Sequence, residues 1–374
     1  MEKNLSALGF MSGTSGDGVD TSVISSNGKD IVNIKYNRFD PYPTILSNKI
    51  HSVKENISER QDILRYLSDI EELEIEVTNF HADIANKINK EIDFDLIGFH
   101  GHTIYHNSDE KISKQIGLGI DLSKITKKNV VYDFRQEDIK NGGEGAPLSP
   151  IYHLALIKEL YSENKVKLPI SILNIGGIAN ITEIDKDFEI MSRDIGPGNC
   201  LIDNWVRKNS TLKYDENGKI ASLGRLNELT LNQAIDNFEF NDFKNSLDIN
   251  DFDISFLRGL DFEEGCATVT EFTAYLIANG INNLRDKNDD LDLFIFCGGG
   301  RKNNFLIKRI ENYINNDQDF ILKNIDDYNL DGDFIESQAF GYLAARSIYN
   351  LPISFPKTTR CLKSISGGEI VDNN

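Results

Sequence analysis

Residues 9–22, GFMSGTSGDGVDTS, decide the fold that the sequence predicts. They join an apolar segment, residues 6–11, to a β-rich segment, residues 21–25, through a turn of Gly, Ser, Thr and Asp. Two short strands joined in this way form a hairpin-like unit. Glycine lets a ligand approach the backbone closely, and successive N–H groups form a concavity that suits phosphate oxygens. The turn is therefore either a phosphate-binding loop or a plain β-turn, and this stretch alone leaves both open.

The residue types in this turn suit a terminal phosphate and its metal ion. The carboxylates of Asp17 and Asp20 are candidate Mg²⁺ ligands, directly or through water. The turn is not a Walker loop, because the pattern GxxxxGK[ST] does not occur in the chain. The candidate phosphate-binding residues are Gly13, Thr14, Ser15, Gly16, Asp17, Gly18 and Asp20.

Two later glycine turns have a similar context. In NIGGIANIT, residues 174–182, Gly176 and Gly177 separate two predicted strands, which is a weak sign of an internal duplication. In CGGGRKNN, residues 297–304, the glycines separate a predicted strand from a helix. Each turn is alternatively a tight connection. Three such turns together favour a nucleotide held between two domains, and Gly298, Gly299 and Gly300 suit the adenosine side.

Strands alternate with helices along the chain, which predicts an α/β fold. Apolar residues recur at three- and four-residue steps over 63–88 and predict a long amphipathic helix. The apolar stretches FDLIGFHG, residues 94–101, and NVVYDFR, residues 129–135, read as strands that end in polar residues. Sheets of this class bind ligands at the carboxyl ends of their strands.

Asp194 lies in SRDIGPGNCLIDNW, residues 192–205, at the end of a predicted strand and just before a helix. A carboxylate in this position is well placed as a general base. Capping the following helix is the commoner use of such an aspartate. The motif by itself favours the cap.

The segment GFHGHTIYH, residues 98–106, contains three histidines: His100, His102 and His106. Zinc is disfavoured, because no cysteine or other fourth ligand accompanies them, and hydrogen bonds to a sugar or a carboxylate are more natural. Arg135 is a candidate clamp for a carboxylate, or a structural partner of Asp138 or Glu144. Glu336 leads a late helix, either as a sugar contact or as a first-turn carboxylate that the helix dipole stabilises.

Length and composition narrow the class of protein. A chain of 374 residues usually forms two domains. The net charge of -19 argues against nucleic acid as a partner. The four cysteines are scattered, which disfavours a disulfide framework and fits a reducing compartment. No apolar run approaches the ~18 residues of a spanning helix, so we expect a cytoplasmic protein without a membrane partner.

Taken together, the motifs resemble the anhydro-N-acetylmuramic acid kinase family of bacterial peptidoglycan recycling. The resemblance extends from Phe10 to about Pro356. The motifs that carry it, in chain order, are MSGTSGDGVD, HGHTIYH, DFRQEDIKNGGEGAPLSP, LNIGGIANIT, IGPGNCLID, CGGGRKNN and ESQAFGYLAAR.

The resemblance implies a two-lobed fold of the sugar kinase/Hsp70/actin type, which is a duplicated RNase H-like fold with ATP in the cleft between the lobes. Residues 1–134 and 352–374 would form the first lobe, and residues 135–351 the second. The implied substrates are 1,6-anhydro-N-acetylmuramate, ATP and water, with Mg²⁺, and the implied assembly is a homodimer.

The resemblance also implies roles for particular residues. Asp194 would activate the water that attacks the anomeric carbon, while the freed 6-oxygen takes the γ-phosphoryl group. Gly176 and Gly177 would lie in the second phosphate loop. Arg135 would bind the lactyl carboxylate or the sugar. His100 and Thr103 would contact the sugar.

The chain departs from the family pattern at several positions, which puts sugar selectivity in question rather than the reaction. The departures are His102 for a usual Gln, Leu118 for Asp, Ile195 for Thr, Arg360 for Gly, and the stretch around 246–251. Two rival functions remain at this stage. One is a related kinase that phosphorylates an ordinary sugar hydroxyl, and the other is a non-catalytic module that senses a nucleotide or sugar.

Overall fold

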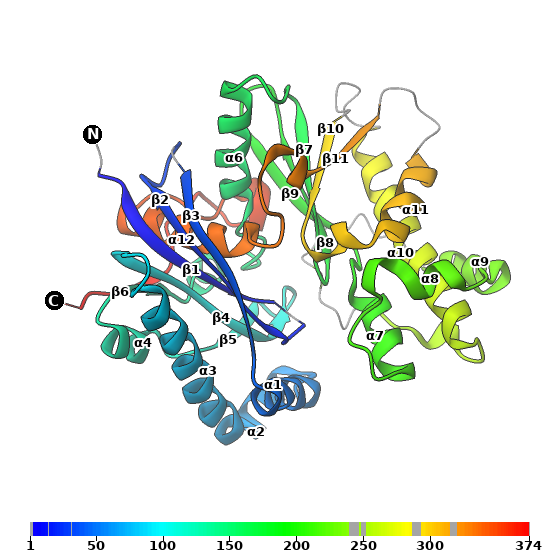
Figure 1. Cartoon of the computed structure of the whole chain (residues 1–374), viewed down its shortest axis with the longest axis horizontal. Helices are drawn as coiled ribbons and strands as arrows, with labels where there is room; N and C mark the ends of the chain where they lie inside the picture. Colours follow the sequence, from blue (N-terminus) through cyan, green and yellow to red (C-terminus); the bar gives the residue numbers. More distant parts are fainter. Residues whose placement is uncertain are drawn as a thin grey trace. The chain divides into compact units, whose positions relative to one another are not determined.

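The computed structural model describes residues 3–13, 15–30, 32–238, 247, 252–285, 293–314 and 320–373. The chain divides into two compact units (Figure 1). Unit 1 comprises Met1–Asn164 and Phe334–Asn374, and unit 2 comprises Lys165–Asp333. Thr14 and all of the stretch 246–251 except Leu247 lie outside the described residues, so the predictions made for them stay predictions.

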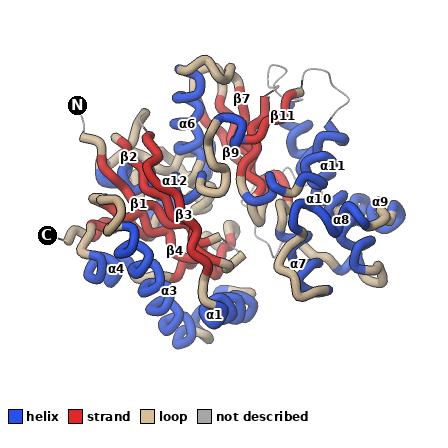
Figure 2. The backbone as a smooth tube through the Cα atoms, in the orientation of Figure 1, coloured by secondary structure: helices blue, strands red, loops and turns tan. Residues whose placement is uncertain are grey.

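Unit 1 is built on one sheet in the order β12-β6-β4-β1-β2-β3, with β5 paired to β4 (Figure 2). The first three strands form an antiparallel meander, and β4 runs parallel to β1 and to β6. The hairpin predicted from residues 9–22 is therefore confirmed. The strands are β1 (Leu5–Ser12), β2 (Gly18–Ser26), β3 (Val32–Pro41), β4 (Leu96–Asn107), β5 (Ile112–Ile116), β6 (Asn129–Tyr132) and β12 (Glu369–Val371).

Helices cover both faces of this sheet. Successive side chains of a strand point to opposite faces. Leu8 and Phe10 of β1 belong to a buried cluster with α1, α3 and α4, while Gly9 between them faces α12. The helices of unit 1 are α1 (Thr44–Asn56), α2 (Arg60–Arg65), α3 (Leu67–Ile88), α4 (Gly119–Thr126), α5 (Gln136–Lys140), α6 (Pro150–Ser162), α12 (Ile335–Ile348) and α13 (Pro356–Thr359).

The helix predicted over 63–88 is present but divided. The backbone of Tyr66, at φ -104° and ψ 22°, separates α2 from α3. The apolar spacing continues across the break, because Ile63 and Ile70 pack on the same cluster. Periodicity therefore identified the buried face correctly and missed the interruption.

Helix α12 lies directly against β1 and β4. A Cβ atom added to Gly9 would lie 2.0 Å from the Ser337 carbonyl oxygen, and one added to Gly98 would lie 2.2 Å from the Phe340 carbonyl oxygen. The Tyr152 hydroxyl of α6 also donates to Gln338 Oε1 of α12, at 2.7 Å. These contacts explain why 135–164 and 334–351, which the sequence analysis assigned to the second lobe, belong to unit 1.

Unit 2 repeats the strand plan of unit 1. Its sheet has the order β11-β10-β7-β8-β9, in which β7, β8 and β9 form an antiparallel meander. Strand β10 runs parallel to β7 and to β11, as β4 does to β1 and β6. The duplication expected from the glycine turns is therefore confirmed. The strands are β7 (Ile170–Ile175), β8 (Ala179–Ile184), β9 (Ile190–Gly196), β10 (Leu293–Cys297) and β11 (Ile321–Asn324).

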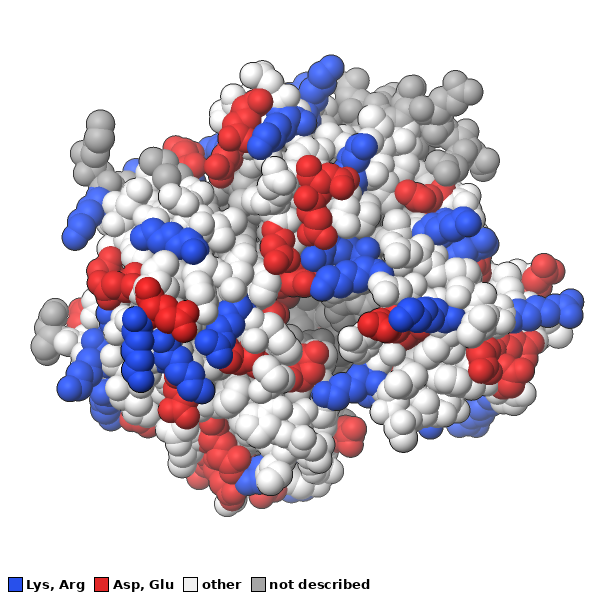
Figure 3. Space-filling view, viewed as in Figure 1, with Lys and Arg blue, Asp and Glu red and all other residues white. Residues whose placement is uncertain are grey.

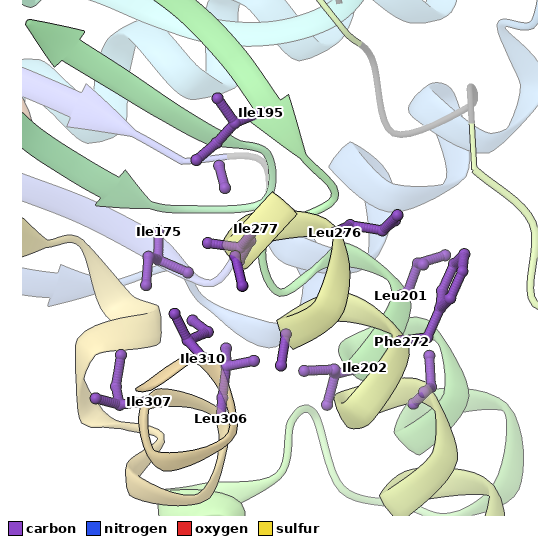
Figure 4. Close-up of a cluster of buried hydrophobic side chains, with 14 of the residues drawn as sticks. Ile175, Ile195, Leu201, Ile202, Phe272, Leu276, Ile277, Leu306, Ile307 and Ile310 are labelled. Atoms are coloured by element: carbon purple, nitrogen blue, oxygen red, sulfur yellow. The ribbon is translucent and has the colours of Figure 1, made fainter. Parts of the chain in front are cut away.

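The core of unit 2 lies between its strands and the helices that pack on them, and Figure 4 shows part of it. Ile175 of β7 and Ile195 of β9 share one apolar cluster with side chains of α7, α10 and α11. The helices are α7 (Cys200–Asn209), α8 (Lys219–Leu223), α9 (Glu228–Asn237), α10 (Phe262–Arg285) and α11 (Asn304–Ile314). The cluster fixes the carboxyl ends of β7 and β9, which are the ends that carry the candidate residues.

Within the described part of the chain, no helix is long and apolar enough to cross a membrane. In the face shown in Figure 3, Lys and Arg side chains are interspersed with Asp and Glu side chains.

Candidate active site

The first glycine turn is held by hydrogen bonds from neighbouring elements of unit 1. Gly16 adopts φ +60° and its N–H donates to the Gly13 carbonyl oxygen at 3.1 Å, which closes the turn. The Ser47 hydroxyl of α1 donates to the Gly16 carbonyl oxygen at 2.7 Å. A Cβ atom on Gly18 would lie 2.5 Å from the Asp40 carbonyl oxygen. Glycine is therefore required at 16 by conformation and at 18 by close packing.

The two aspartates of this stretch differ in position. Asp17 lies in the turn, and its Oδ1 accepts a hydrogen bond from the Ser15 hydroxyl at 2.6 Å. Asp20 lies within β2, opposite Met11 of β1. Among the described residues, no group of three or more His, Cys, Asp or Glu residues is arranged to hold a metal ion. A single half-buried carboxylate still suits Mg²⁺, which usually takes one or two carboxylates, substrate phosphates and water.

The residue before the turn anchors it to the sheet. Ser12 Oγ is 2.9 Å from His102 Nδ1, accepts from the Tyr42 hydroxyl at 2.9 Å, and lies 3.3 Å from the Gly18 carbonyl oxygen. His102 is fully buried, and burial lowers its pKa to about 3. This neutral histidine therefore supports the turn from beneath, which is a role that the sequence analysis did not assign to it.

His100 and Arg135 bind each other. Arg135 Nε and Nη2 donate to His100 Nε2 at 3.1 and 3.0 Å, and His100 Nδ1 donates to the Gly101 carbonyl oxygen at 3.0 Å. Burial, with the Arg135 charge adding to it, lowers the pKa of His100 well below its ordinary value. The imidazole is therefore neutral and both its nitrogens are engaged, so it orients Arg135 rather than presenting a donor to a sugar.

The other residues predicted to bind sugar lie in the same unit. Thr103 is on β4, and its Oγ1 accepts from Gln115 Nε2 at 3.1 Å. Glu336 is in the first turn of α12, where the helix dipole favours a carboxylate. His106 Nδ1 lies 3.0 Å from Ser113 Oγ. His100, His102 and His106 thus have three different sets of partners.

In unit 2, the second glycine turn is locked to the start of α7. The carbonyl oxygens of Gly176 and Gly177 accept from the N–H groups of Asn199 and Cys200, at 2.8 and 3.1 Å. Gly198 has φ +51°, and a Cβ atom there would lie 2.5 Å from the Gly176 carbonyl oxygen. The sequence analysis did not assign Asn199 a role, although its place in GPGN was a usable signal.

The third glycine turn packs on the end of β7, directly before the second glycine turn. A Cβ atom on Gly298 would lie 2.4 Å from Asn174 Oδ1, and one on Gly300 would lie 2.3 Å from Ile175 Cγ2. Gly299 has no atom within 4 Å of such a Cβ. The structure therefore brings together 176–177, 198–200 and 298–300 in unit 2, and Gly299 is the position with open space.

Arg301 fixes this turn to the loop that follows β11, a role not predicted from sequence. Its side chain is 3% exposed and forms ion pairs with Asp326, Asp331 and Asp333. Its Nη1 also donates to the Gly298 carbonyl oxygen at 3.2 Å. Most N–H donors of a buried guanidinium surrounded by several carboxylates have an acceptor, and these charged hydrogen bonds hold the loop in one position.

Asp194 lies near the carboxyl end of β9, opposite Asn180 of β8, and is 6% exposed. Its Oδ2 accepts from the Leu247 N–H at 2.7 Å. The N-cap of α7 is Asn199, five residues later, so the helix-cap interpretation of Asp194 is wrong. The arrangement gives an oriented, largely buried carboxylate near the carboxyl end of β9.

Three departures from the family pattern have clear structural partners. Ile195 is buried against α10, where a Cβ atom on Gly280 would lie 2.7 Å from the Ile195 Cβ. The Leu118 N–H donates to Thr78 Oγ1 at 2.9 Å. Arg360 adopts φ +62° and its Nη1 donates to Glu144 Oε2 at 2.6 Å. Glu144, one of the alternative partners considered for Arg135, thus binds the C-terminal segment.

The chain is similar in sequence to proteins of one family over nearly its whole length. The model of a family described as "Anhydro-N-acetylmuramic acid kinase" matches residues 5–373. A protein of that name from Pelagibacter ubique (strain HTCC1062) is 48% identical over 380 aligned residues. The alignment covers 100% of this chain and 100% of the relative. Another from Zymomonas mobilis subsp. mobilis is 37% identical, with 97% of this chain and 99% of the relative covered.

Among solved structures, a ROK family glucokinase from Streptomyces griseus in complex with glucose and AMPPNP is similar at 10% sequence identity and a TM-score of 0.43. The similarity covers 91% of this chain and 99% of that chain. The sequence relatives, which match over nearly their whole length, assign the family without it. The chain belongs to the anhydro-N-acetylmuramic acid kinase family.

Proposed function

We propose that the protein is an ATP-dependent kinase that opens 1,6-anhydro-N-acetylmuramic acid with water and phosphorylates it, in peptidoglycan recycling. The products are N-acetylmuramic acid 6-phosphate and ADP. The observation that carries the proposal is the oriented carboxylate of Asp194, in a unit that also holds two packed glycine turns. The full-length relatives of the chain bear this kinase name.

In this reaction Asp194 is the general base. It takes a proton from the water that attacks the anomeric carbon, and the bond from that carbon to the bridging 6-oxygen breaks. The 6-oxygen then takes the γ-phosphoryl group, and ADP leaves. The hydrogen bond from the Leu247 N–H to Oδ2 orients the carboxylate, and a base so placed typically contributes about 10²–10⁴ in rate.

Unit 2 would bind the nucleotide through its glycine turns. The side of Gly299 that a Cβ would occupy has no neighbour within 4 Å, so a flat base or ribose can approach the backbone there. Gly176 and Gly177 would lie along the phosphates. Phosphoryl transfer depends mainly on positioning and on stabilisation of charge, and both need a rigid frame such as the one formed with α7.

Unit 1 would supply the other phosphate turn, residues 13–18, and the sugar contacts. Asp17 would hold Mg²⁺ through water, and the ion would neutralise charge on the phosphates. Arg135 would bind the lactyl carboxylate, because a guanidinium matches a carboxylate with two parallel hydrogen bonds. Thr103 and Glu336 remain proposed sugar contacts.

We further propose that the enzyme works in the cytoplasm, where ATP is available, and forms a homodimer as the family resemblance implies. Its partners would be small molecules. The net charge of -19 supports the expectation that nucleic acid is not among them.

The test is ADP release with 1,6-anhydro-N-acetylmuramic acid in ¹⁸O-water, followed by mass analysis of the sugar phosphate. The proposal expects ADP release that depends on the anhydro sugar and one ¹⁸O on the anomeric carbon. Product without label would support a kinase acting on an ordinary hydroxyl. Nucleotide binding with no ADP release would support the sensing module.

A further inference from the structure

The loop after α5 is bound to the C-terminal segment of the chain. The Glu144 N–H donates to the Thr359 carbonyl oxygen at 2.8 Å, and the Leu362 N–H donates to the Asn141 carbonyl oxygen at 3.2 Å. The ion pair between Arg360 and Glu144 adds a side-chain contact at 2.6 Å. Residues 141–145 are thus held by a segment more than 200 positions away in sequence.

Asp138 is the centre of this connection. It is 1% exposed, and both of its carboxylate oxygens accept hydrogen bonds. Oδ1 accepts from the Thr359 hydroxyl at 2.6 Å, and Oδ2 accepts from the Gly145 N–H at 2.7 Å. A Cβ atom on Gly143 would lie 2.1 Å from Asp138 Oδ2, so the loop folds tightly around the carboxylate. A buried charge held in this way fixes the position of both its partners.

Gly145 connects Asp138 to Arg135. The Gly145 N–H is bound by Asp138, and the Gly145 carbonyl oxygen accepts from Arg135 Nη1 at 3.3 Å. On its other side the guanidinium donates to His100 Nε2. His100 itself packs against Phe340 of α12, with ring centroids 4.4 Å apart and ring planes tilted by 34°. The guanidinium therefore lies between two supports, one on β4 and one on the loop 141–145.

We propose that Asp138 and Thr359 are positioning residues for Arg135, and that the C-terminal segment thereby sets the geometry of the site that binds the substrate carboxylate. The inference rests on the proposed function for its substrate. Removing the Thr359 hydroxyl takes away the short hydrogen bond to Asp138 Oδ1. We expect the carboxylate to shift, the Gly145 peptide to move with it, and Arg135 to lose its alignment.

The test compares Thr359→Val with Thr359→Ser, which keeps the hydroxyl, and with Thr358→Val. Thr358 is a matched control, because it is also buried in α13 but its hydroxyl donates only locally, to the Phe355 carbonyl oxygen at 3.1 Å. We expect Thr359→Val to raise KM for the anhydro sugar about tenfold, with little change in KM for ATP. Thr359→Ser and Thr358→Val should stay within about twofold of the parent enzyme.

A double-mutant cycle with Arg135→Ala separates positioning from a general structural effect. If Thr359 acts through Arg135, Thr359→Val should add almost nothing in the Arg135→Ala background. An equal effect in both backgrounds, or no effect of Thr359→Val on sugar KM, would overturn the proposal. Asp138→Asn, which is isosteric and keeps one acceptor, provides a second route if Thr359→Val folds poorly, and should show the same selective rise.

The failure of the proposed function would look different. In that case the parent enzyme would not release ADP with the anhydro sugar at all. The positioning proposal would then be tested by the ¹⁵N resonances of labelled His100, which reports on Arg135 through its Nε2. Those resonances should move in Thr359→Val and not in Thr358→Val, and unchanged spectra in both variants would reject it.

Discussion

Asp194 and Asp138 are both buried aspartates, but their hydrogen-bond partners differ, and so do the roles that we infer for them. Asp138 accepts from Thr359 and Gly145 on its two oxygens and serves the architecture of unit 1. Asp194 lies near the end of β9, where its Oδ2 accepts from the Leu247 N–H. The sequence could suggest Asp194 from its motif. It offered Asp138 only as a partner of Arg135, because Thr359, the residue that Asp138 binds, is distant in the chain.

Asp194→Asn should lower turnover by about 10²–10⁴ while leaving ATP affinity nearly unchanged, because an amide cannot take the proton from water. Steady-state ADP release and calorimetric titration with a non-hydrolysable ATP analogue measure the two quantities. Near-normal product formation by the variant would show that Asp194 is not the base. An equal loss of ATP affinity would point to damaged folding instead.

The histidines give unit 1 a pH dependence that unit 2 should lack, because all six lie between residues 51 and 153. Burial lowers the pKa of His81 to about 4 and that of His102 and His153 to about 3. The ordinary pKa is about 6.5, so the unfolded chain binds protons first as the pH falls. Stability from these groups is fully present above about pH 6.5 and is lost as the pH falls toward 3–4.

From pH 6.5 to pH 5, each such histidine should remove about 2 kcal/mol from the free energy of unfolding of unit 1. Hydrogen exchange of unit 1 peptides against pH measures this loss. Trp205 is the single tryptophan and lies in unit 2, so its fluorescence in urea is an internal control. His102→Gln should reduce the pH dependence of the free energy of unfolding of unit 1 by the contribution of one histidine. If the loss of stability between pH 6.5 and pH 5 were unchanged in this variant, His102 would not contribute to it.

The glycine turns are elements whose importance the sequence signalled and whose contacts it did not. Flexible, polar turns between strands predicted a ligand-binding backbone. No local pattern indicated that the 176–177 carbonyl oxygens bind the start of α7, or that Gly300 packs on Ile175, because these contacts join distant segments. Local pattern identifies a turn, whereas its rigidity depends on tertiary packing.

Gly299 and Gly300 form a matched pair for testing this distinction. Gly300→Ala should lower the free energy of unfolding of unit 2 by about 1–3 kcal/mol, because its Cβ would overlap Ile175. Gly299→Ala should change stability by less than about 0.5 kcal/mol, because its Cβ meets no protein atom. Urea titration of Trp205 fluorescence measures both.

Gly299→Ala should instead raise KM for ATP, since the added methyl group would occupy the space proposed for the nucleotide. Equal destabilisation by the two variants would contradict the packing described for Gly300. Unchanged ATP kinetics in Gly299→Ala would remove that position from the proposed nucleotide site.

For the protein as a whole, the sequence predicted the duplicated α/β fold and the family, because both rest on ordered local motifs. It did not predict where the units divide. The boundaries at Asn164/Lys165 and Asp333/Phe334 depend on α12, whose backbone packs on Gly9 and Gly98. Glycine at 9 and 98 is ambiguous in sequence, since its packing role appears only when the partner helix is known.

Because unit 2 is continuous in sequence and unit 1 is not, residues 165–333 should fold alone, whereas residues 1–164 should not. The fragment 1–164 lacks the helix that covers one face of its sheet. Joining 1–164 to 334–374 through a short Gly/Ser linker should restore a cooperative urea transition, followed by circular dichroism. A cooperative transition in 1–164 alone would contradict this dependence.

The packing of α12 on β1 also determines when the sheet of unit 1 can be completed during translation. Translation from residue 164 to the end of α12 at residue 348 adds 184 residues, or roughly 10–40 s at ~5–20 residues per second. Throughout that interval the nascent amino-terminal sheet emerges from the ribosome with one side bare, while the inserted unit can already mature. Chaperone protection of this incomplete sheet therefore matters most in the cell before α12 has been made.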